Sequence, residues 1–283
     1  MIKKPLTFLQ FASPWFFDPG TVRLPSPPEG MSCEEVSRRL LAGELMQPYI
    51  LETDSERRLH FSHAAVQSVM RLDEPDALVN AYTRKMMSFL LFNPNPKSIV
   101  LVGLGGGSLA KFCYRYLRKA QICVVEIDPR VIALRDEFCI PADDHRFRVV
   151  CADGASFVSN LPDRVDVILV DAFDSIGLAP TLASSDFYVQ AALRLAPNGV
   201  LVMNFSGAPA RYATHISRIR AAFGSALLVP VVADDNLLLF TFRKRIHLPT
   251  TAKYESRAQH LQSRLALEFP RYLRRICQAQ VLS

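Results

Sequence analysis

A short apolar run that ends in glycines constrains this chain more than any other stretch. Residues 99–102 are apolar and mostly β-branched, and a helical pattern begins at Ser108. Four glycines lie between them: Gly103, Gly105, Gly106 and Gly107. This order is typical of a buried parallel strand, a tight turn and a helix whose unpaired N–H groups favour an anion or a polar ribose. The sequence therefore predicts a nucleotide-binding turn.

A glutamate closes the next apolar run, which covers residues 122–125. Glu126 lies roughly 20 residues beyond the turn, the offset at which an acid at the end of the second strand binds a ribose diol. The turn alone is a weaker signal, because Ser108 stands where the G-x-G-x-x-G pattern has its third glycine. A surface glutamate at a strand end is the alternative, but the order of turn, helix and acid favours ribose binding by Glu126.

Strands and helices alternate beyond residue 98. The expected strands cover residues 99–102, 122–126, 146–150, 165–170 and 199–205. Expected helices begin at residues 108 and 153 and cover residues 129–138 and 185–195, and alternation of this kind predicts a parallel sheet with helices on both faces. The runs 226–232 and 236–243 flank a polar turn and predict a terminal antiparallel hairpin. The expected fold is α/β, a Rossmann-like, methyltransferase-type parallel sheet with this terminal hairpin.

A small antiparallel β unit precedes the parallel sheet. Residues 49–53, 58–62 and 66–70 are extended runs joined by polar turns, and a helical pattern follows over residues 76–92. The expected organisation has an N-terminal extension of unassigned role (1–46), the β unit with its linking helix (47–93) and a nucleoside-binding catalytic domain (94–283). We expect a helix over 33–41 and helices over 251–278 that break at Pro270.

Acids follow three of the predicted strands. They are Glu126, Asp128, Asp153 (with Gly154) and the pair Asp171 and Asp174. Ligands of open parallel sheets lie beyond the carboxyl ends of the strands, so we expect these carboxylates to gather at one site, although each can also serve as a helix cap. Such acids suit ribose hydroxyls, an adenine amine, and an amine that is held or deprotonated near a cationic sulfonium. Neighbouring carboxylates raise one another's pKa, which favours a general base.

Charge and composition narrow the class of protein. The net charge of +6 comes largely from residues 243–275, which favours a solvated helical face over a nucleic-acid site. No apolar stretch is long enough to span a bilayer, and the six histidines form no ligand-spaced cluster, so we expect neither a membrane nor a metal. The cysteines, Cys33, Cys113, Cys123, Cys139, Cys151 and Cys277, form no C-x-x-C pair. We interpret them as reduced core thiols of a cytoplasmic protein.

Several short motifs accompany the glycine turn in a fixed order. Val66-Gln67 precedes the helical segment that contains Tyr82. Glu126-Ile127-Asp128 and Asp153-Gly154 follow two strands, Asp171 opens the stretch D-A-F-D-S-I-G, and F-Y follows at residues 187–188. In this order the motifs resemble those of the spermidine synthases, the polyamine aminopropyltransferases, over about residues 49–205.

The resemblance implies a role for each motif. Tyr82 is similar to the tyrosine of the family's Y-H-E segment, and Asp171 to the base that opens D-S-S-D-P-x-G, so we expect Tyr82, Asp171 and Asp174 to be catalytic. The residues expected to bind the nucleoside co-substrate are Gln67, Gly103, Gly105, Gly106, Gly107, Glu126, Asp128, Asp153 and Gly154. A small-molecule amine acceptor, no metal and a homodimer are also implied.

Departures from the family concern the donor. The family's turn reads G-G-G-D-G, and its Asp pairs with the amine of decarboxylated S-adenosylmethionine; here we align that position with Gly105. The His and Glu that follow the tyrosine are replaced by Thr83 and Arg84. Without the acid, the helix N-terminus and an inward-pointing Arg84 would favour ordinary S-adenosylmethionine, which carries a carboxylate.

The expected function is aminopropyl transfer from a sulfonium nucleoside to an amine. The donor is decarboxylated S-adenosylmethionine or S-adenosylmethionine. The alternatives are methyl or aminocarboxypropyl transfer from S-adenosylmethionine, and a nucleoside-binding homologue without catalysis.

Overall fold

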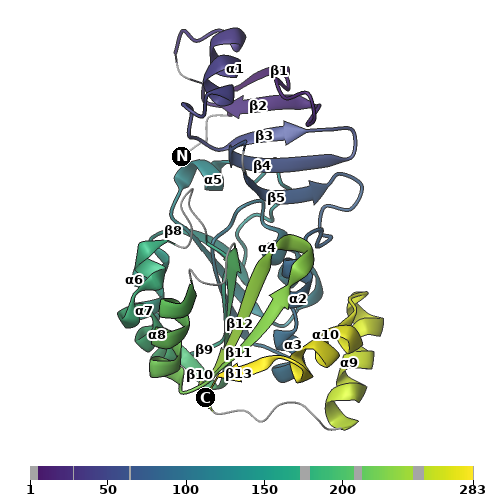
Figure 1. Cartoon of the computed structure of the whole chain (residues 1–283), viewed down its shortest axis with the longest axis vertical. Helices are drawn as coiled ribbons and strands as arrows, with labels where there is room; N and C mark the ends of the chain where they lie inside the picture. The colour runs from purple at the N-terminus through teal and green to yellow at the C-terminus, as the bar shows by residue number, and fades with distance from the viewer. Residues whose placement is uncertain are drawn as a thin grey trace.

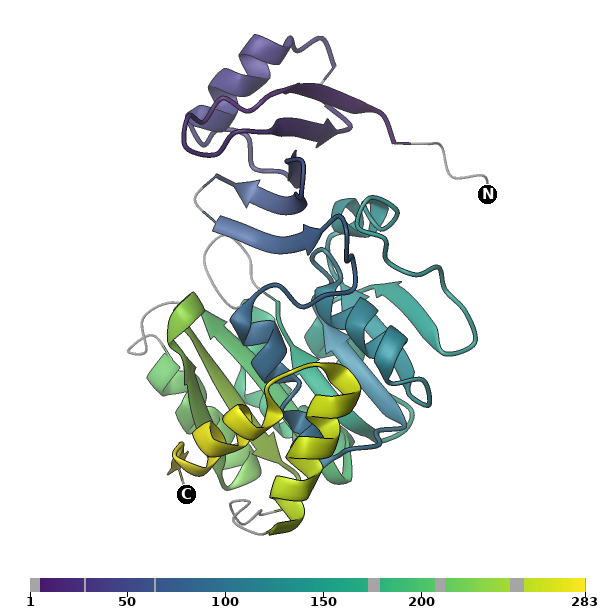
Figure 2. The ribbon, with the colours of Figure 1, turned by 90° about the vertical axis from the view of Figure 1, so that its right-hand side faces the viewer.

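The chain folds into two units that are stacked end to end. The computed structural model describes residues 6–27, 29–63, 65–172, 179–206, 212–244 and 252–282. Figure 1 shows a small N-terminal sheet above a larger sheet that is flanked by helices. In the view turned by 90°, the N-terminal sheet stands over one end of the larger unit (Figure 2). This arrangement places the N-terminal unit next to the ends of the large sheet's strands.

The N-terminal sheet is antiparallel, in the strand order β1-β2-β3-β4-β5. Its strands are β1 (Phe8–Ala12), β2 (Thr21–Pro25), β3 (Tyr49–Glu52), β4 (Glu56–Ser62) and β5 (Ala65–Arg71). The small antiparallel unit is therefore confirmed, but it begins earlier in the chain than we expected. Because β2 pairs with β3 at Val22 and Leu51, the boundary expected at residue 46 falls inside this sheet.

The large sheet has the order β13-β11-β12-β10-β9-β6-β7-β8. Its strands are β6 (Ser98–Val102), β7 (Gln121–Glu126), β8 (Phe147–Cys151), β9 (Val165–Val170), β10 (Leu195–Ser206), β11 (Ala226–Val231), β12 (Asn236–Phe242) and β13 (Gln280–Leu282). Neighbours from β10 to β8 are parallel, whereas β12, β11 and β13 add antiparallel edges, so the predicted Rossmann-like fold is confirmed. The chain leaves β6 for β7 and β8 and then returns to β9 on the other side of β6. A sheet of this kind binds its ligand at such a switch point.

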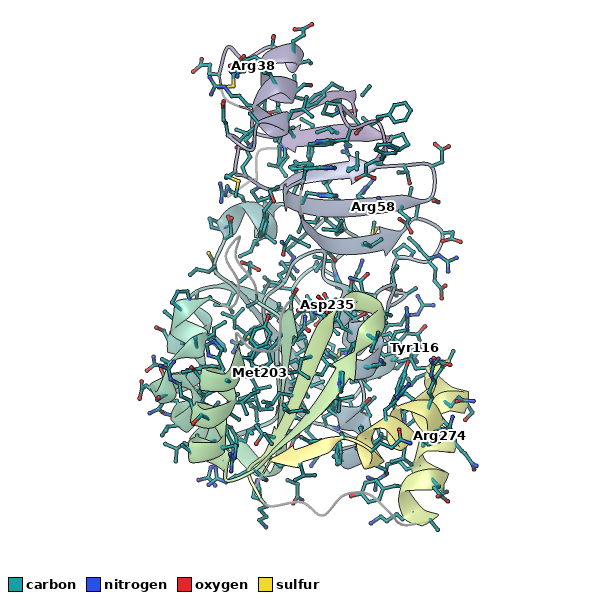
Figure 3. The ribbon with its side chains drawn as sticks, viewed as in Figure 1. Arg38, Arg58, Tyr116, Met203, Asp235 and Arg274 are labelled. Atoms are coloured by element: carbon teal, nitrogen blue, oxygen red, sulfur yellow. The ribbon has the colours of Figure 1, made fainter. Side chains whose placement is uncertain are left out.

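Helices cover both faces of the large sheet. The helices of the described chain are α1 (Cys33–Leu41), α2 (Ala81–Met86), α3 (Phe89–Phe92), α4 (Ser108–Tyr116), α5 (Pro129–Ala133), α6 (Gly154–Ser159), α7 (Ser185–Arg194), α8 (Ala213–Phe223), α9 (Ala252–Leu265) and α10 (Phe269–Cys277). Successive strand residues point to opposite faces, so Val100 packs with α6, α7 and α8, and Leu101 packs with α3, α4, α9 and α10. Side chains fill the space between these layers (Figure 3).

Three elements differ from the sequence expectation. The helix expected over residues 76–92 is only α2 and α3, and ahead of α2 the carbonyls of Leu78 and Val79 accept hydrogen bonds from the Arg84 guanidinium. Helix α5 ends at Ala133, and the chain beyond it brings Ile140 against Gly107 of the glycine turn. Strand β13 was not expected from the sequence.

The two units are joined by an apolar contact and by an ion cluster. Ile50, Leu59 and Met70 of the N-terminal sheet belong to the same core as the large sheet. Beside them, the Glu137 carboxylate of the larger unit forms ion pairs with the Arg23 guanidinium at 2.7 Å and the Arg57 guanidinium at 3.3 Å. Glu52 forms ion pairs with the same two arginines. These side chains are partly buried, so the cluster fixes how β2, β3 and β4 sit on the segment beyond α5.

The cysteines are less uniform than their sequence pattern indicated. Cys113 and Cys123 are buried, whereas Cys139, Cys151 and Cys277 are exposed, so the expectation of core thiols holds for the first two alone. In the described part of the chain, no helix is both long and apolar enough to cross a membrane.

Candidate active site

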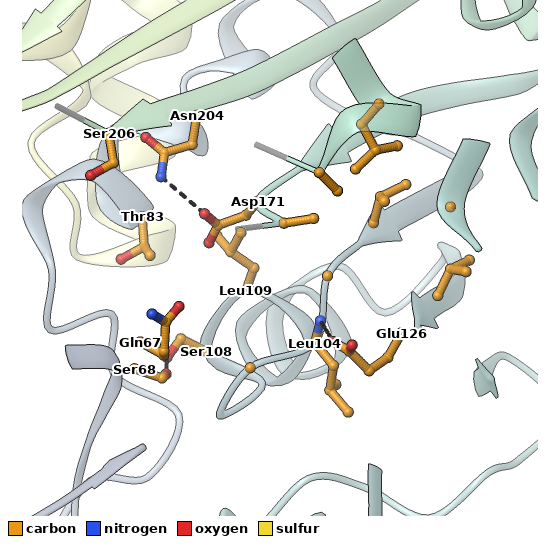
Figure 4. Close-up of a pocket in the computed structure, with 18 of the residues that line it drawn as sticks. Gln67, Ser68, Thr83, Leu104, Ser108, Leu109, Glu126, Asp171, Asn204 and Ser206 are labelled. Atoms are coloured by element: carbon orange, nitrogen blue, oxygen red, sulfur yellow. Dashed lines mark hydrogen bonds between the residues drawn. The ribbon is translucent and has the colours of Figure 1, made fainter. Parts of the chain in front are cut away.

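A cavity of about 590 Å³ lies at the carboxyl ends of the parallel strands, with β4 and β5 forming part of its wall. Figure 4 shows the Glu126, Asp171 and Gln67 side chains around it. The predicted residues that line it are Gln67, Tyr82, Gly103, Gly105, Glu126, Asp153, Gly154 and Asp171. Gly106, Gly107 and Asp128 do not line it, and Asp174 lies outside the described residues. The topology therefore gathers most of the predicted site in one place.

Glycine at position 103 is required by the close approach of β6 and β9. Gly103 follows Val102 with φ of +98°, a conformation that side chains rarely adopt. A Cβ atom there would lie 2.2 Å from the carbonyl oxygen of Asp171. Gly103 thus lets the glycine turn and the backbone of Asp171 lie side by side.

Glu126 holds the turn and faces the cavity. One carboxylate oxygen accepts the Leu104 N–H at 2.9 Å (Figure 4). The other accepts the Asp128 N–H, also at 2.9 Å. Each oxygen has a second lone pair, so the carboxylate can still accept hydrogen bonds from ribose hydroxyls. The geometry fits the predicted role of Glu126.

We expect Glu126→Ala to weaken nucleoside binding by about 1–3 kcal/mol, because hydrogen bonds to a charged group are lost. Calorimetric titration with 5′-methylthioadenosine measures the change. Glu126→Gln retains one acceptor oxygen and should lose less. Equal affinity in all three folded proteins would contradict the ribose-binding role.

The two other strand-end acids serve partly as helix caps. Asp153 accepts the Ser156 N–H at the start of α6 and the Thr181 hydroxyl at 2.9 Å, while remaining in the cavity wall. Burial acts to raise the pKa of Asp153, but these hydrogen bonds hold it below the usual value. Asp128 caps α5 through the Arg130 N–H and pairs with the Arg130 guanidinium. Its carboxylate is therefore committed outside the cavity wall.

Asp171 lies at the end of the cavity that is bordered by β10 and by the turn between β11 and β12. Its two oxygens accept the Asn204 amide at 2.9 Å and the Tyr82 hydroxyl at 3.2 Å. Burial raises the pKa of Asp171 above that of an ordinary aspartate, against these hydrogen bonds, which act to lower it. Burial and the Asp171 charge raise the pKa of Tyr82 well above its usual value, so the phenol stays a donor. The arrangement suits a general base that is held in place by two neutral partners.

A double irregularity in β4 and β5 supplies the roof of the cavity. Leu59 pairs with Ser68, but the next pair is His60 with Val66, so the register skips Gln67; the following step skips Phe61. Both skipped residues line the cavity. Such bulges redirect side chains, and here they turn the glutamine of the V-Q motif toward the ligand space.

The sequence analysis missed three polar residues that line the cavity near Tyr82 and Asp171. Asp234, in the turn between β11 and β12, accepts the Tyr82 N–H at 2.6 Å, and Asn236 donates to Asn204 at 2.9 Å. Asp234, Asn204 and Asn236 all line the cavity. Asn204 and Asn236 carry no motif, and the Asp234-Asp235 pair was interpreted only as a hairpin turn. The available signal was that Asp234 and Asn236 belong to a polar turn region beside the carboxyl end of the sheet, whereas Asn204 lies within β10.

The cavity wall is acidic. Among its described residues are four carboxylates, Glu126, Asp153, Asp171 and Asp234, and no lysine, arginine or histidine. Arg84 does not point inward, because it bonds the carbonyls of Leu78 and Val79. In the described ranges, no group of three or more histidine, cysteine, aspartate or glutamate side chains has the arrangement of a metal site. The wall therefore suits a ligand with cationic groups.

The glycine turn differs from our alignment by one residue. Counted from Gly103, where the turn begins, the fourth letter of G-G-G-D-G falls on Gly106 rather than Gly105. A Cβ atom on Gly106 would lie 2.7 Å from the Ser68 hydroxyl, which is itself 3.3 Å from the Ser108 hydroxyl. At Gly105 the nearest atom would be 3.9 Å away. A side chain therefore fits at position 105 and not at position 106.

Comparisons with known proteins agree with this geometry. Residues 79–224 match the model of the spermine/spermidine synthase domain. A polyamine aminopropyltransferase of Chromobacterium violaceum is 38% identical over 231 residues, which cover 81% of this chain and 88% of the relative. A polyamine aminopropyltransferase of Neisseria meningitidis serogroup A is 34% identical over 227 residues, 79% of this chain and 86% of the relative.

Solved structures share the fold at lower identity. A spermidine synthase in complex with the transition-state analogue AdoDATO aligns with a TM-score of 0.56 and 19% identity, covering 70% of this chain and 68% of that chain. The family model, the relatives that match over most of their length, and the shared fold point to one conclusion. The chain belongs to the spermine/spermidine synthase family and is a transferase.

Proposed function

We propose that this protein transfers an aminopropyl group from decarboxylated S-adenosylmethionine to an amine. The observation that carries the proposal is the Asp171 carboxylate, held by Tyr82 and Asn204 in an acidic cavity beside the glycine turn. The names of the relatives, polyamine aminopropyltransferases, support the reaction class.

The donor nucleoside occupies the end of the cavity near β6 and β7. Glu126 accepts the ribose hydroxyls, and Asp153 accepts from the adenine amine. The exposed Ile127 side chain offers an apolar surface at the same end. The cationic sulfonium then lies toward Asp171, where the acidic wall stabilises it.

The transfer is a direct displacement. Asp171 accepts a proton from the acceptor ammonium, and the freed nitrogen lone pair forms a bond to the methylene carbon beside sulfur. The carbon–sulfur bond breaks, its electron pair stays on sulfur, and a neutral thioether nucleoside leaves. The reaction requires alignment and charge placement, which the fixed Tyr82–Asp171–Asn204 set provides. We extend the proposal to Asp174, which together with Asp171 would hold or deprotonate the acceptor amine.

S-adenosylmethionine is the second candidate donor. It is favoured by the absence of an acid from the glycine turn, which leaves the N-terminus of α4 open to a carboxylate. It is disfavoured by the absence of any cationic side chain from the described cavity wall. The fold supports either donor, since human methyltransferase-like protein 13 in complex with SAH aligns with a TM-score of 0.60, at 22% identity, over 66% of this chain and 93% of its own.

Side-by-side calorimetry and product analysis with the two donors test the proposal. Mass spectrometry should show an amine that has gained an aminopropyl group, together with 5′-methylthioadenosine, only with the decarboxylated donor. Transfer from S-adenosylmethionine alone, or tight nucleoside binding without any product, would overturn it. A cytoplasmic homodimer is part of the proposal, and light scattering of the purified protein measures the assembly.

Gly105→Asp is expected to shift donor preference. The new carboxylate fits at this position and faces the cavity, so it attracts the ammonium of the decarboxylated donor and repels the carboxylate of S-adenosylmethionine. We expect the difference in binding free energy between the two donors, obtained from the ratio of their dissociation constants, to change by on the order of 1–3 kcal/mol. Gly105→Asn is the matched control, because it has the same shape and the same tolerance of positive φ. An identical ratio in the two variants would show that position 105 does not face the donor's tail.

A further inference from the structure

Asn236, the first residue of β12, contacts the side chain of Asn204 on β10. In the antiparallel pair of these strands, Ser206 lies opposite Asn236. Asn204 precedes Ser206 by two residues on the same face of β10, so Asn236 is its diagonal neighbour across the strands. The Asn236 amide nitrogen donates to the Asn204 amide oxygen at 2.9 Å. Because an asparagine amide accepts only at its oxygen, this bond leaves the Asn204 nitrogen facing the other way.

The Asn204 nitrogen faces Asp171. It donates to one Asp171 carboxylate oxygen at 2.9 Å (Figure 4), and the Tyr82 hydroxyl donates to the other at 3.2 Å. Asn204 is only 2% exposed, so its amide depends on these protein partners rather than on water. Both Asp171 oxygens therefore meet donors, and an ionised carboxylate, which only accepts, fits these surroundings better than a protonated one.

The opposite orientation of the Asn204 amide would reverse this preference. Its oxygen would then face Asp171, and a carboxylate fits beside an acceptor only when it carries a proton. The hydrogen bond from Asn204 acts to lower the pKa of Asp171, against burial, which raises it. The direction of this one amide thus decides whether Asn204 supports or opposes ionisation of Asp171.

The charged groups around Asp171 do not take over this task. The titratable side chains that line the cavity with it are Tyr82, Glu126, Asp153 and Asp234. These groups are neutral or acidic, and like charges disfavour ionisation of Asp171. Lys85, which is not in the wall, interacts electrostatically with Asp234. Among the described residues of the wall, neutral donors are therefore what favours the ionised base.

We infer that Asn236 is a positioning residue for the reaction, because by holding the Asn204 amide it keeps a donor aimed at Asp171 and favours the ionised carboxylate. The inference rests on the proposed function, in which that carboxylate accepts the proton of the amine. Asn236 lies beyond residues 79–224, the region that matches the family model. Its role requires no contact with either substrate.

Asn236→Leu tests the inference, because leucine resembles asparagine in shape and cannot donate. Loss of the donor lets the Asn204 amide turn, so the pKa of Asp171 should rise. We expect the acidic inflection of the pH–rate profile to move up by about one pH unit, which lowers kcat about 10-fold below the inflection and leaves it unchanged well above it. KM for the nucleoside donor should stay as in the wild type.

Asn236→Asp should move the inflection further in the same direction. Its carboxylate only accepts, so the Asn204 nitrogen turns toward it and the amide oxygen faces Asp171. The added negative charge also raises the pKa of Asp171, and Asn236→Leu, which adds no charge, separates the two causes. Asn198→Asp is the matched control, because it makes the same change at an exposed position near the opposite end of β10. Its profile should match that of the wild type.

Carbon-13 NMR titration of the Asp171 carboxyl group, assigned by its absence from Asp171→Asn, measures the same pKa without turnover. A higher pKa in Asn236→Leu would support the inference even in a protein that transfers no aminopropyl group, where the proposed function alone fails. An unchanged pKa in Asn236→Leu would overturn the inference, even if Asn236→Asp shifts it and the enzyme is active. A fall in kcat that is equal at every pH would also overturn it, since this outcome shows a structural role.

Discussion

Asp171→Asn is expected to lower turnover by about two to four orders of magnitude, the range for loss of a general base. The variant should stay folded, because its amide oxygen accepts from Asn204 and its amide nitrogen donates to the Tyr82 oxygen. Nucleoside affinity should change little, since Glu126 and the glycine turn are untouched. Single-turnover kinetics with saturating donor measure the loss.

The pH profile gives the same test a second readout. The wild-type rate should rise with pH as Asp171 ionises, at a pKa that burial raises above the ordinary value. Asp171→Asn should lack this inflection. Asp163→Asn, an exposed acid that precedes the opposite end of β9, is the control and should behave as wild type. Wild-type turnover in Asp171→Asn would show that the residue is structural.

Gly103→Ala is expected to destabilise the fold by about 2–5 kcal/mol. Positive φ costs about 1–2 kcal/mol for a residue with a Cβ atom, and forced overlap costs about 1–3 kcal/mol more. The overlap arises because the Cβ atom would lie 2.2 Å from the Asp171 carbonyl oxygen. Urea denaturation measures the free energy of unfolding.

Gly105→Ala separates the cost of positive φ from the cost of steric overlap. Gly105 also has positive φ, at +50°, but its Cβ atom would meet nothing closer than 3.9 Å. It should therefore show the backbone cost alone. Equal destabilisation by the two substitutions would mean that β6 and β9 separate without cost, and that Asp171 is not fixed by this contact.

The sequence predicted the parts of the site that depend on local order. The strand, the glycine turn and the helix are consecutive in the chain, so the sequence predicted where the turn lies. Glu126, Asp153 and Asp171 follow strands whose carboxyl ends lie at the same edge of the sheet, so their gathering was also predicted. Asp128 shows the limit of that argument, because a strand-end acid can equally cap the next helix, and here it does.

The parts that were missed depend on pairing between distant segments. That β2 joins β3 is set by contacts such as Val22 with Leu51, which no local pattern contains. Gln67 was identified through a motif, but its exposure to the cavity follows from a register shift against Leu59 and His60. Asp234 reaches the site only because β12 lies next to β10, so its turn meets Tyr82. Such pairings are fixed by the whole sheet.

The position of β5 over the glycine turn has a thermodynamic consequence. The cavity is lined by Gln67 and Ser68 of the N-terminal unit and by Glu126 and Asp171 of the larger one, so a ligand that fills it would contact both units. Its binding free energy therefore adds to that of the Arg23, Arg57 and Glu137 ion cluster in holding the units together. We therefore expect a bound nucleoside to link the two units, and the chain to unfold more cooperatively with the nucleoside than without it.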